Sequence, residues 1–98
     1  RLAAFARDSG LAYQLGAHVG ETAILSAACR HLAAHGGDAR FVEGSYGTML
    51  LTEDVVRTSL RFGHKGRGAL LTGKGLGVDV LQERIDRYAL GRVDRPAP

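Results

Sequence analysis

The stretch that decides the fold is residues 11–43, LAYQLGAHVGETAILSAACRHLAAHGGDARFVE. Residues 11–17 (LAYQLGA) alternate larger apolar side chains with small or polar ones over a length too short for a helix, which predicts a strand. Residues 21–35 have helical periodicity, and residues 39–43 (ARFVE) predict a second short strand. A strand, a helix and a strand joined by glycine-containing turns predict a βαβ unit with parallel strands.

The predicted helix 21–35 carries an apolar stripe at helical spacing. The stripe consists of Ile24, Leu25, Ala28, Cys29 and Leu32. We expect this face to lie against the strands, with Cys29 as an unreactive core thiol. Parallel sheets need cover on both faces, so two strands and one helix call for further elements around them.

The N-terminal flank, residues 1–8, predicts another helix, which begins without a capping residue and ends before Gly10. The first residue is Arg1 rather than Met, and no signal peptide follows. We therefore expect the chain to be part of a longer protein.

The second half of the chain has a different character. Residues 52–54 (TED) predict a capped helix start with acidic first-turn residues. The apolar segments on either side of the glycine-containing turn 64–68 predict an antiparallel hairpin over residues 57–72. Residues 79–90 predict a short terminal helix, and residues 91–98 a polar, proline-ended tail.

Composition limits the function classes. The chain has 98 residues, a net charge of +3, 45% hydrophobic and 23% charged residues, which is typical of one globular domain. It is too short for a complete α/β barrel, which needs roughly 250 residues. No apolar run approaches the ~18 residues of a membrane span, so we expect no membrane partner. A single cysteine excludes an intramolecular disulfide and a multi-cysteine zinc site, and a reducing cytoplasm is the default expectation.

The positive charge does not predict a nucleic-acid interface. The eleven arginines are scattered, without a basic run and without interleaved aromatic residues. Lys65 and Lys74 both lie in glycine-rich turns, and the segment 73–77 (GKGLG) lacks the strand and helix context of a phosphate-binding loop.

The candidate chemistry lies at the strand ends. Glu21 and Glu43 each stand at or just past the C-terminal end of a predicted parallel strand, the edge at which ligands bind in α/β sheets. A carboxylate there can act as an acid, a base or a metal ligand. His18, in the first turn, is a candidate base, although no HExxH pattern accompanies it. The alternative is structural: Glu21 as a first-turn helix acid and Glu43 as a loop acid.

Three stretches resemble a known family in order and spacing. The segment 9–34, SGLAYQLGAHVGETAILSAACRHLAA, resembles the seventh barrel strand and following helix of the mandelate racemase/muconate lactonizing enzyme family of the enolase superfamily. The segment 40–56, RFVEGSYGTMLLTEDVV, resembles the eighth strand and its exit loop, and 73–80, GKGLGVDV, the closing Gly-Leu-Gly-Val segment. The TEDVV segment favours the cycloisomerase side of the family.

The resemblance implies a modified α/β barrel of which this chain is the C-terminal end. Residues 1–56 would supply the last barrel strands and their helix, 57–90 the hairpin and terminal helix, and 91–98 the tail. The implied reaction removes the proton α to a carboxylate in a small substrate, with Mg²⁺ stabilising the enediolate. The lysine bases and the Mg²⁺ carboxylates would precede Arg1, so the isolated chain is expected to be inactive.

The family's functional residues can be matched to positions in this sequence only in part. His18 lies near the place of a histidine base found in some members. A gapped alignment places the family's eighth-strand acid, which hydrogen-bonds the substrate, at Glu43, whereas an ungapped one places Gly44 there. The alternative function is a small, stand-alone α/β interaction module without catalysis. Under either reading the open strand edges predict a homo-oligomer.

Overall fold

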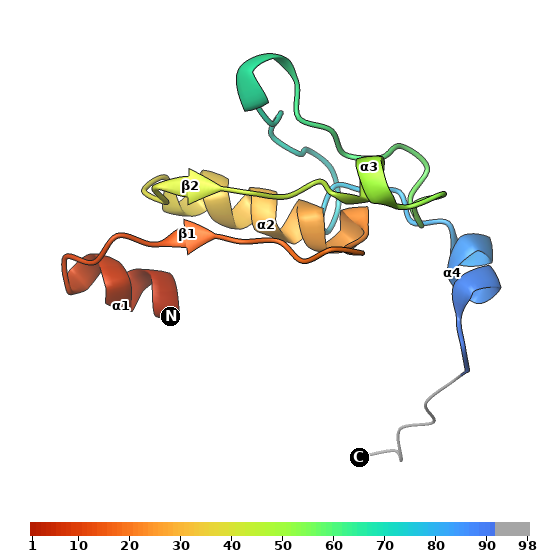
Figure 1. The fold of residues 1–98 in the computed structure, drawn as a ribbon, viewed down its shortest axis with the longest axis horizontal. Coiled ribbons are helices and arrows are strands. Elements are labelled where there is room, and N and C mark those ends of the chain that lie inside the picture. The colour runs from red at the N-terminus through yellow and green to blue at the C-terminus, as the bar shows by residue number, and fades with distance from the viewer. Residues whose placement is uncertain (92–98) are drawn as a thin grey trace.

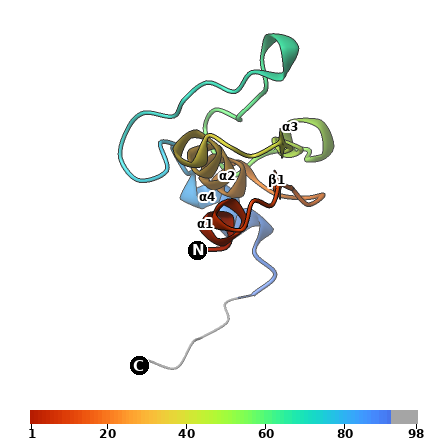
Figure 2. The ribbon, with the colours of Figure 1, turned by 90° about the vertical axis from the view of Figure 1, so that its left-hand side faces the viewer.

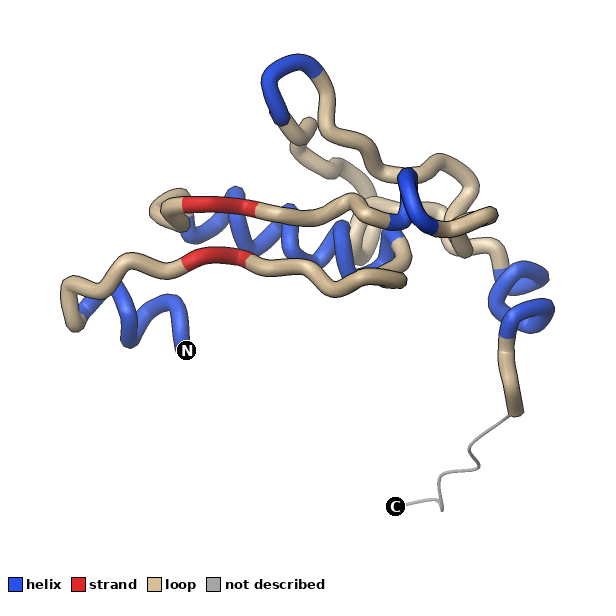
Figure 3. Tube along the Cα trace, viewed as in Figure 1, coloured by secondary structure: helices blue, strands red, loops and turns tan. Residues whose placement is uncertain are grey.

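The structure, a computed structural model, describes residues 1–91 as short elements joined by long connections (Figures 1 and 3). In chain order the elements are α1 (Leu2–Asp8), β1 (Gln14–Leu15), α2 (Ala23–Gly36), β2 (Phe41–Val42), α3 (Gly47–Leu50), the 3₁₀ turn η1 (His64–Gly66) and α4 (Gln82–Tyr88). The predicted tail, residues 91–98, lies outside the described residues except for its first residue.

The predicted βαβ unit is confirmed. β1 and β2 are parallel, with Gln14 opposite Phe41 and Leu15 opposite Val42. The pairing extends one backbone bond beyond each end of β2: the Arg40 N–H donates to the Tyr13 carbonyl at 2.9 Å, and the Glu43 N–H donates to the Leu15 carbonyl at 2.9 Å. Both strands are shorter than predicted. Within residues 1–91 each strand pairs only with the other, and the regular ladder covers only the two residues of each that lie in register.

α2 covers one face of the two strands, and it lies behind them in Figure 1. Its 14 residues are followed by the C-cap residue Gly37, whose φ of 68° is a left-handed conformation that favours glycine. The prediction that the large apolar side chains of its stripe would be buried is wrong. The buried residues of α2 are Ala23, Ser26 and Ala27, whereas Leu25 and Leu32 are 55% and 45% exposed. Within residues 1–91 no element covers the larger side chains.

The predicted hairpin over residues 57–72 is also wrong. This segment is a protruding loop with η1 at its tip, seen in teal in Figures 1 and 2. Backbone bonds close the tip: the Gly63 N–H donates to the Arg67 carbonyl at 2.7 Å, and the Gly66 N–H donates to the Gly63 carbonyl at 3.1 Å. The two arms do not pair because their carbonyls, those of Arg61 and Ala69, accept hydrogen bonds from the Arg30 guanidinium instead, at 3.2 and 3.3 Å.

Residues 52–54 do not start a helix. The short helix in this region, α3, ends earlier, and Asp54 lies in an irregular segment that crosses the N-terminus of α2. Val56 then forms an isolated antiparallel bridge with Val80. The predicted terminal helix is confirmed as α4, which begins later and ends earlier than expected.

Arg84 ties α4 back to the segment after α3. One of its guanidinium nitrogens, Nη1, donates to the carbonyls of Asp54 at 2.8 Å and Val56 at 2.7 Å. Its Nε lies 3.0 Å from a carboxylate oxygen of Glu53. The C-terminal helix is therefore fixed to the segment that also contacts the start of α2.

Little apolar surface is buried. Ala23, Ala27 and Val56 are the buried apolar residues of the described chain, and Val56 is the largest of them. Large apolar side chains stay exposed on α1, where Leu2 is 86% and Phe5 is 66% exposed. Within residues 1–91 no helix combines the length and apolar composition required to cross a bilayer.

Candidate functional site

Glu43 lies directly after β2, on the face of the strands that α2 leaves open. Val42 lines the space against α2, and side chains alternate along a strand, so Phe41 and Glu43 project from the opposite face. The Gln14 side chain of β1 reaches the same face, where its Nε2 donates to Glu43 Oε1 at 2.9 Å. This bond positions the carboxylate from the neighbouring strand, and the Glu43 side chain remains exposed.

Glu21 has a structural role in the turn between β1 and α2. Its Oε1 accepts a hydrogen bond from the His18 backbone N–H at 2.8 Å, and its own N–H donates to the His18 carbonyl at 3.2 Å. The two bonds close the turn immediately before the helix. The Glu21 carboxylate is therefore occupied in fixing the loop at the carboxyl end of β1.

The three predicted site residues do not form one bonded cluster. His18 is exposed, and within residues 1–91 its ring makes no hydrogen bond to either glutamate. The described chain also brings together no group of three or more histidine, cysteine, aspartate or glutamate side chains that could hold a metal ion. Of the three, Glu43 alone is both exposed and held by a side chain from the neighbouring strand.

Asp54 supports this edge of the sheet and was not predicted to do so. Both its carboxylate oxygens lie 3.1 Å from the Ala23 backbone N–H, and Asp54 is only 6% exposed. A carboxylate at this position satisfies a free N–H of the helix terminus and interacts favourably with the helix dipole. The sequence pattern around Thr52 and Asp54 predicts the start of a new helix at that place. It does not indicate that Asp54 caps α2, whose first residue lies 31 positions earlier.

Gly47 brings the two strand-end loops into contact. A Cβ at this position would lie 2.9 Å from the Glu21 carbonyl oxygen and 3.2 Å from Asp54 Oδ2. The start of α3 therefore packs against the turn that Glu21 closes, at a distance that only glycine allows. This contact fixes the loop after Glu43 relative to the loop after β1.

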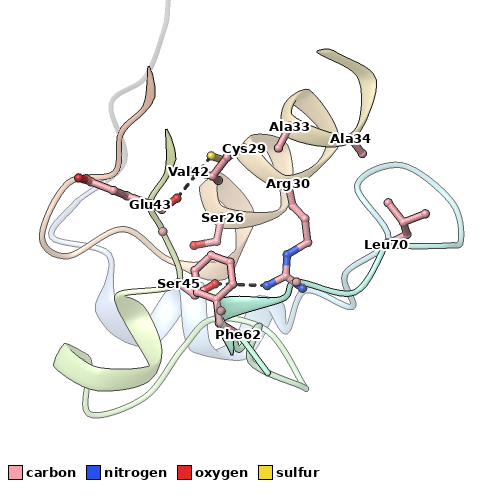
Figure 4. Close-up of a pocket in the computed structure, with 13 residues that line it drawn as sticks. Ser26, Cys29, Arg30, Ala33, Ala34, Val42, Glu43, Ser45, Phe62 and Leu70 are labelled. Carbon is pink, nitrogen blue, oxygen red and sulfur yellow. Dashed lines mark hydrogen bonds between the residues drawn. The ribbon is translucent and has the colours of Figure 1, made fainter. Parts of the chain in front are cut away.

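A pocket of about 300 Å³ lies on the other face of the sheet, between α2, the end of β2 and the loop 57–72 (Figure 4). Cys29 lies in its wall, with Sγ 3.8 Å from the Glu43 carbonyl oxygen. Burial, and then the nearby charge of Glu21, raise the pKa of the Cys29 thiol above its ordinary value. The thiol is therefore less ionised and less nucleophilic than an exposed one.

Comparisons of the chain with protein-family models, with curated proteins and with solved structures give no match. What the geometry offers is one oriented carboxylate at the carboxyl end of a parallel strand pair.

Proposed function

We propose that the chain forms the last two strands of a modified α/β barrel of the mandelate racemase/muconate lactonizing enzyme type. In this proposal Glu43 faces the barrel interior and contacts a small carboxylate substrate while the α-proton of the substrate is removed. The observation that carries the proposal is the placement of Glu43: it follows a parallel strand at its carboxyl end, projects away from α2 and is held by Gln14.

The open face of the strand pair supports a barrel. Phe41 on this face is 62% exposed, and Gln14 and Glu43 are exposed beside it. Parallel strands are normally covered on both faces, and the inner face of an α/β barrel is filled by side chains from the other strands. Strands contributed by residues outside this chain would cover Phe41 and leave Glu43 at the carboxyl-end opening.

Glu43 would act through a hydrogen bond that strengthens as the reaction proceeds. When the α-proton leaves the substrate, negative charge develops on the carboxylate oxygens, and a donor placed there stabilises the transition state more than the ground state. Gln14 engages Glu43 Oε1. Oε2 is thereby left free to face the substrate, and the proposed role requires the assembled barrel to keep a proton on it.

The residues described do not form a Mg²⁺ site by themselves, since no three ligand-type side chains come together within residues 1–91. In the proposal the metal, which neutralises enediolate charge in the family, is bound by residues outside this chain. The isolated chain should therefore be inactive and should give no tight stoichiometric site in calorimetric titration with Mg²⁺.

The coding sequence upstream of Arg1 gives the first test. The proposal requires six further strand segments there, with a Lys-x-Lys pair and carboxylates at successive strand ends. A start codon immediately before Arg1 would contradict it and favour the alternative, a stand-alone interaction module whose exposed apolar residues pair with a second copy.

The second test compares two glutamates in the full-length enzyme. Glu43→Leu, which keeps the approximate size but cannot donate, should lower kcat by roughly 10²- to 10³-fold, the usual effect of losing one oxyanion donor, and leave the melting temperature unchanged. Glu21→Leu is the matched control, because it removes the neighbouring carboxylate that accepts the His18 N–H and closes the turn, and it should lower the melting temperature more than kcat. Wild-type turnover in Glu43→Leu would make Glu43 a structural acid and refute its proposed role.

A further inference from the structure

The pocket on the helix side of the sheet has the features of a second, separate binding site. We propose that it binds a small amphipathic carboxylate, with the apolar body between α2 and the loop 57–72 and the carboxylate at Arg30. The proposal does not depend on the barrel function, because the Glu43 side chain points away from this pocket and only its backbone lies at the wall (Figure 4).

The size and lining of the pocket suit the apolar part of such a ligand. Its volume, about 300 Å³, is at the lower end of the range for small-molecule sites. The walls are mainly apolar, with Ala33 on α2, Val42 on β2, and Phe62 and Leu70 on the loop. Val42 is 42% and Leu70 73% exposed, so an apolar ligand would cover surface that now faces water.

Arg30 provides the anchor for a negative charge. Its guanidinium lies at the pocket wall, over the Phe62 ring at 5.6 Å from the centroid, and donates to the Arg61 and Ala69 carbonyls and to Ser45 Oγ. All of these acceptors are neutral. Within residues 1–91 no carboxylate lies within ion-pair distance of Arg30, so its charge is uncompensated by an anion.

The loop that forms the outer wall adds to the positive potential. Residues 55–78 contain no aspartate or glutamate. The same segment contains five of the 13 lysines and arginines, namely Arg57, Arg61, Lys65, Arg67 and Lys74. Of these, Arg57 pairs with Asp79 just beyond the segment. An anion entering the pocket therefore meets a positive field from the loop as well as from Arg30, which favours a carboxylate over a neutral ligand of the same shape.

The test uses 2-naphthoate and its neutral counterpart, 2-naphthalenemethanol, as probes on the full 98-residue chain. Calorimetric titration at one protein concentration should show that naphthoate binds roughly ten- to hundredfold more tightly, the factor expected for one charge-assisted hydrogen-bonded contact. Added salt should weaken naphthoate binding and leave binding of the alcohol unchanged. Equal affinities, or no binding of either probe, would overturn the proposal.

Substitutions of single residues locate the site. Arg30→Met should remove the preference for naphthoate over the alcohol, and Arg30→Lys should keep part of that preference. Arg40→Met is the matched control and should keep the preference, because Arg40 lies outside the pocket lining. Since Arg30 also holds the loop, Leu70→Asp offers a second route: Leu70 is exposed, and a carboxylate there should repel naphthoate but not the alcohol. An equal loss in Arg40→Met and Arg30→Met, or an unchanged preference in Leu70→Asp, would refute the assignment.

Discussion

Replacing Asp54 with alanine should destabilise the chain by about 2 kcal/mol. The substitution removes the acceptor of the Ala23 N–H at the start of α2, a buried contact in which both carboxylate oxygens lie at 3.1 Å. Loss of a side-chain cap costs about 0.5 to 2 kcal/mol, and a buried N–H without a partner costs about 1 to 3 kcal/mol. These describe the same bond, so they are not added. Asp54→Asn keeps an oxygen acceptor but loses the charge at the helix terminus, and should cost about 1 kcal/mol.

Urea unfolding followed by far-ultraviolet circular dichroism measures this effect, with equal slopes required in all variants. Asp86→Ala is the matched control, because Asp86 is an exposed acid whose carboxylate bonds to Gln82 in the same helix, and it should change stability by less than about 0.5 kcal/mol. Hydrogen exchange at the Ala23 amide should accelerate in Asp54→Ala. Equal effects of the two alanine substitutions would refute the capping argument.

Three further predictions concern other contacts. Gly47→Ala should destabilise the chain by about 1 to 3 kcal/mol in the same urea assay, because its methyl group would lie 2.9 Å from the Glu21 carbonyl oxygen; wild-type stability would show that the loops yield. The hydrogen bond to Asp38 raises the pKa of Tyr13. This bond therefore stabilises the folded chain at pH values below the ordinary pKa of tyrosine, and its contribution is lost as the pH rises through the raised pKa of Tyr13. Asp38→Ala should lower the pKa of Tyr13 in an alkaline ultraviolet titration, and an unchanged curve would contradict the contact. The exposed apolar residues predict self-association of the isolated chain at micromolar concentration in light scattering, and a well-folded monomer would contradict that prediction.

The βαβ unit could be predicted because its signals are local. The alternation around Tyr13, the helical periodicity of residues 21–35 and the glycines after the helix each depend on neighbouring residues, and the structure confirms a parallel pair joined by α2. The position of Glu43 at the strand end followed from the same pattern.

The incorrect predictions all involve contacts between residues far apart in the sequence. Arg30 binds the carbonyls of the loop 57–72 and prevents the hairpin, and Asp54 caps a helix that ends well before it. Nothing in the local pattern distinguishes Asp54 from the first-turn acid of a new helix. The prediction for the apolar stripe of α2 is wrong for a related reason, since burial of Leu25 and Leu32 requires a neighbour that residues 1–91 do not supply.

The bridge between Val56 and Val80 means that the chain is held together independently of its protruding loop. On either side of the bridge, the Arg57 N–H donates to the Asp79 carbonyl at 2.8 Å and the Leu81 N–H donates to the Val55 carbonyl at 2.9 Å. Trypsin cleavage at the exposed Lys65 would thus sever the backbone without removing these contacts. The two fragments would stay associated, and the loop tip is the place to divide the chain into complementing halves or to insert a reporter peptide.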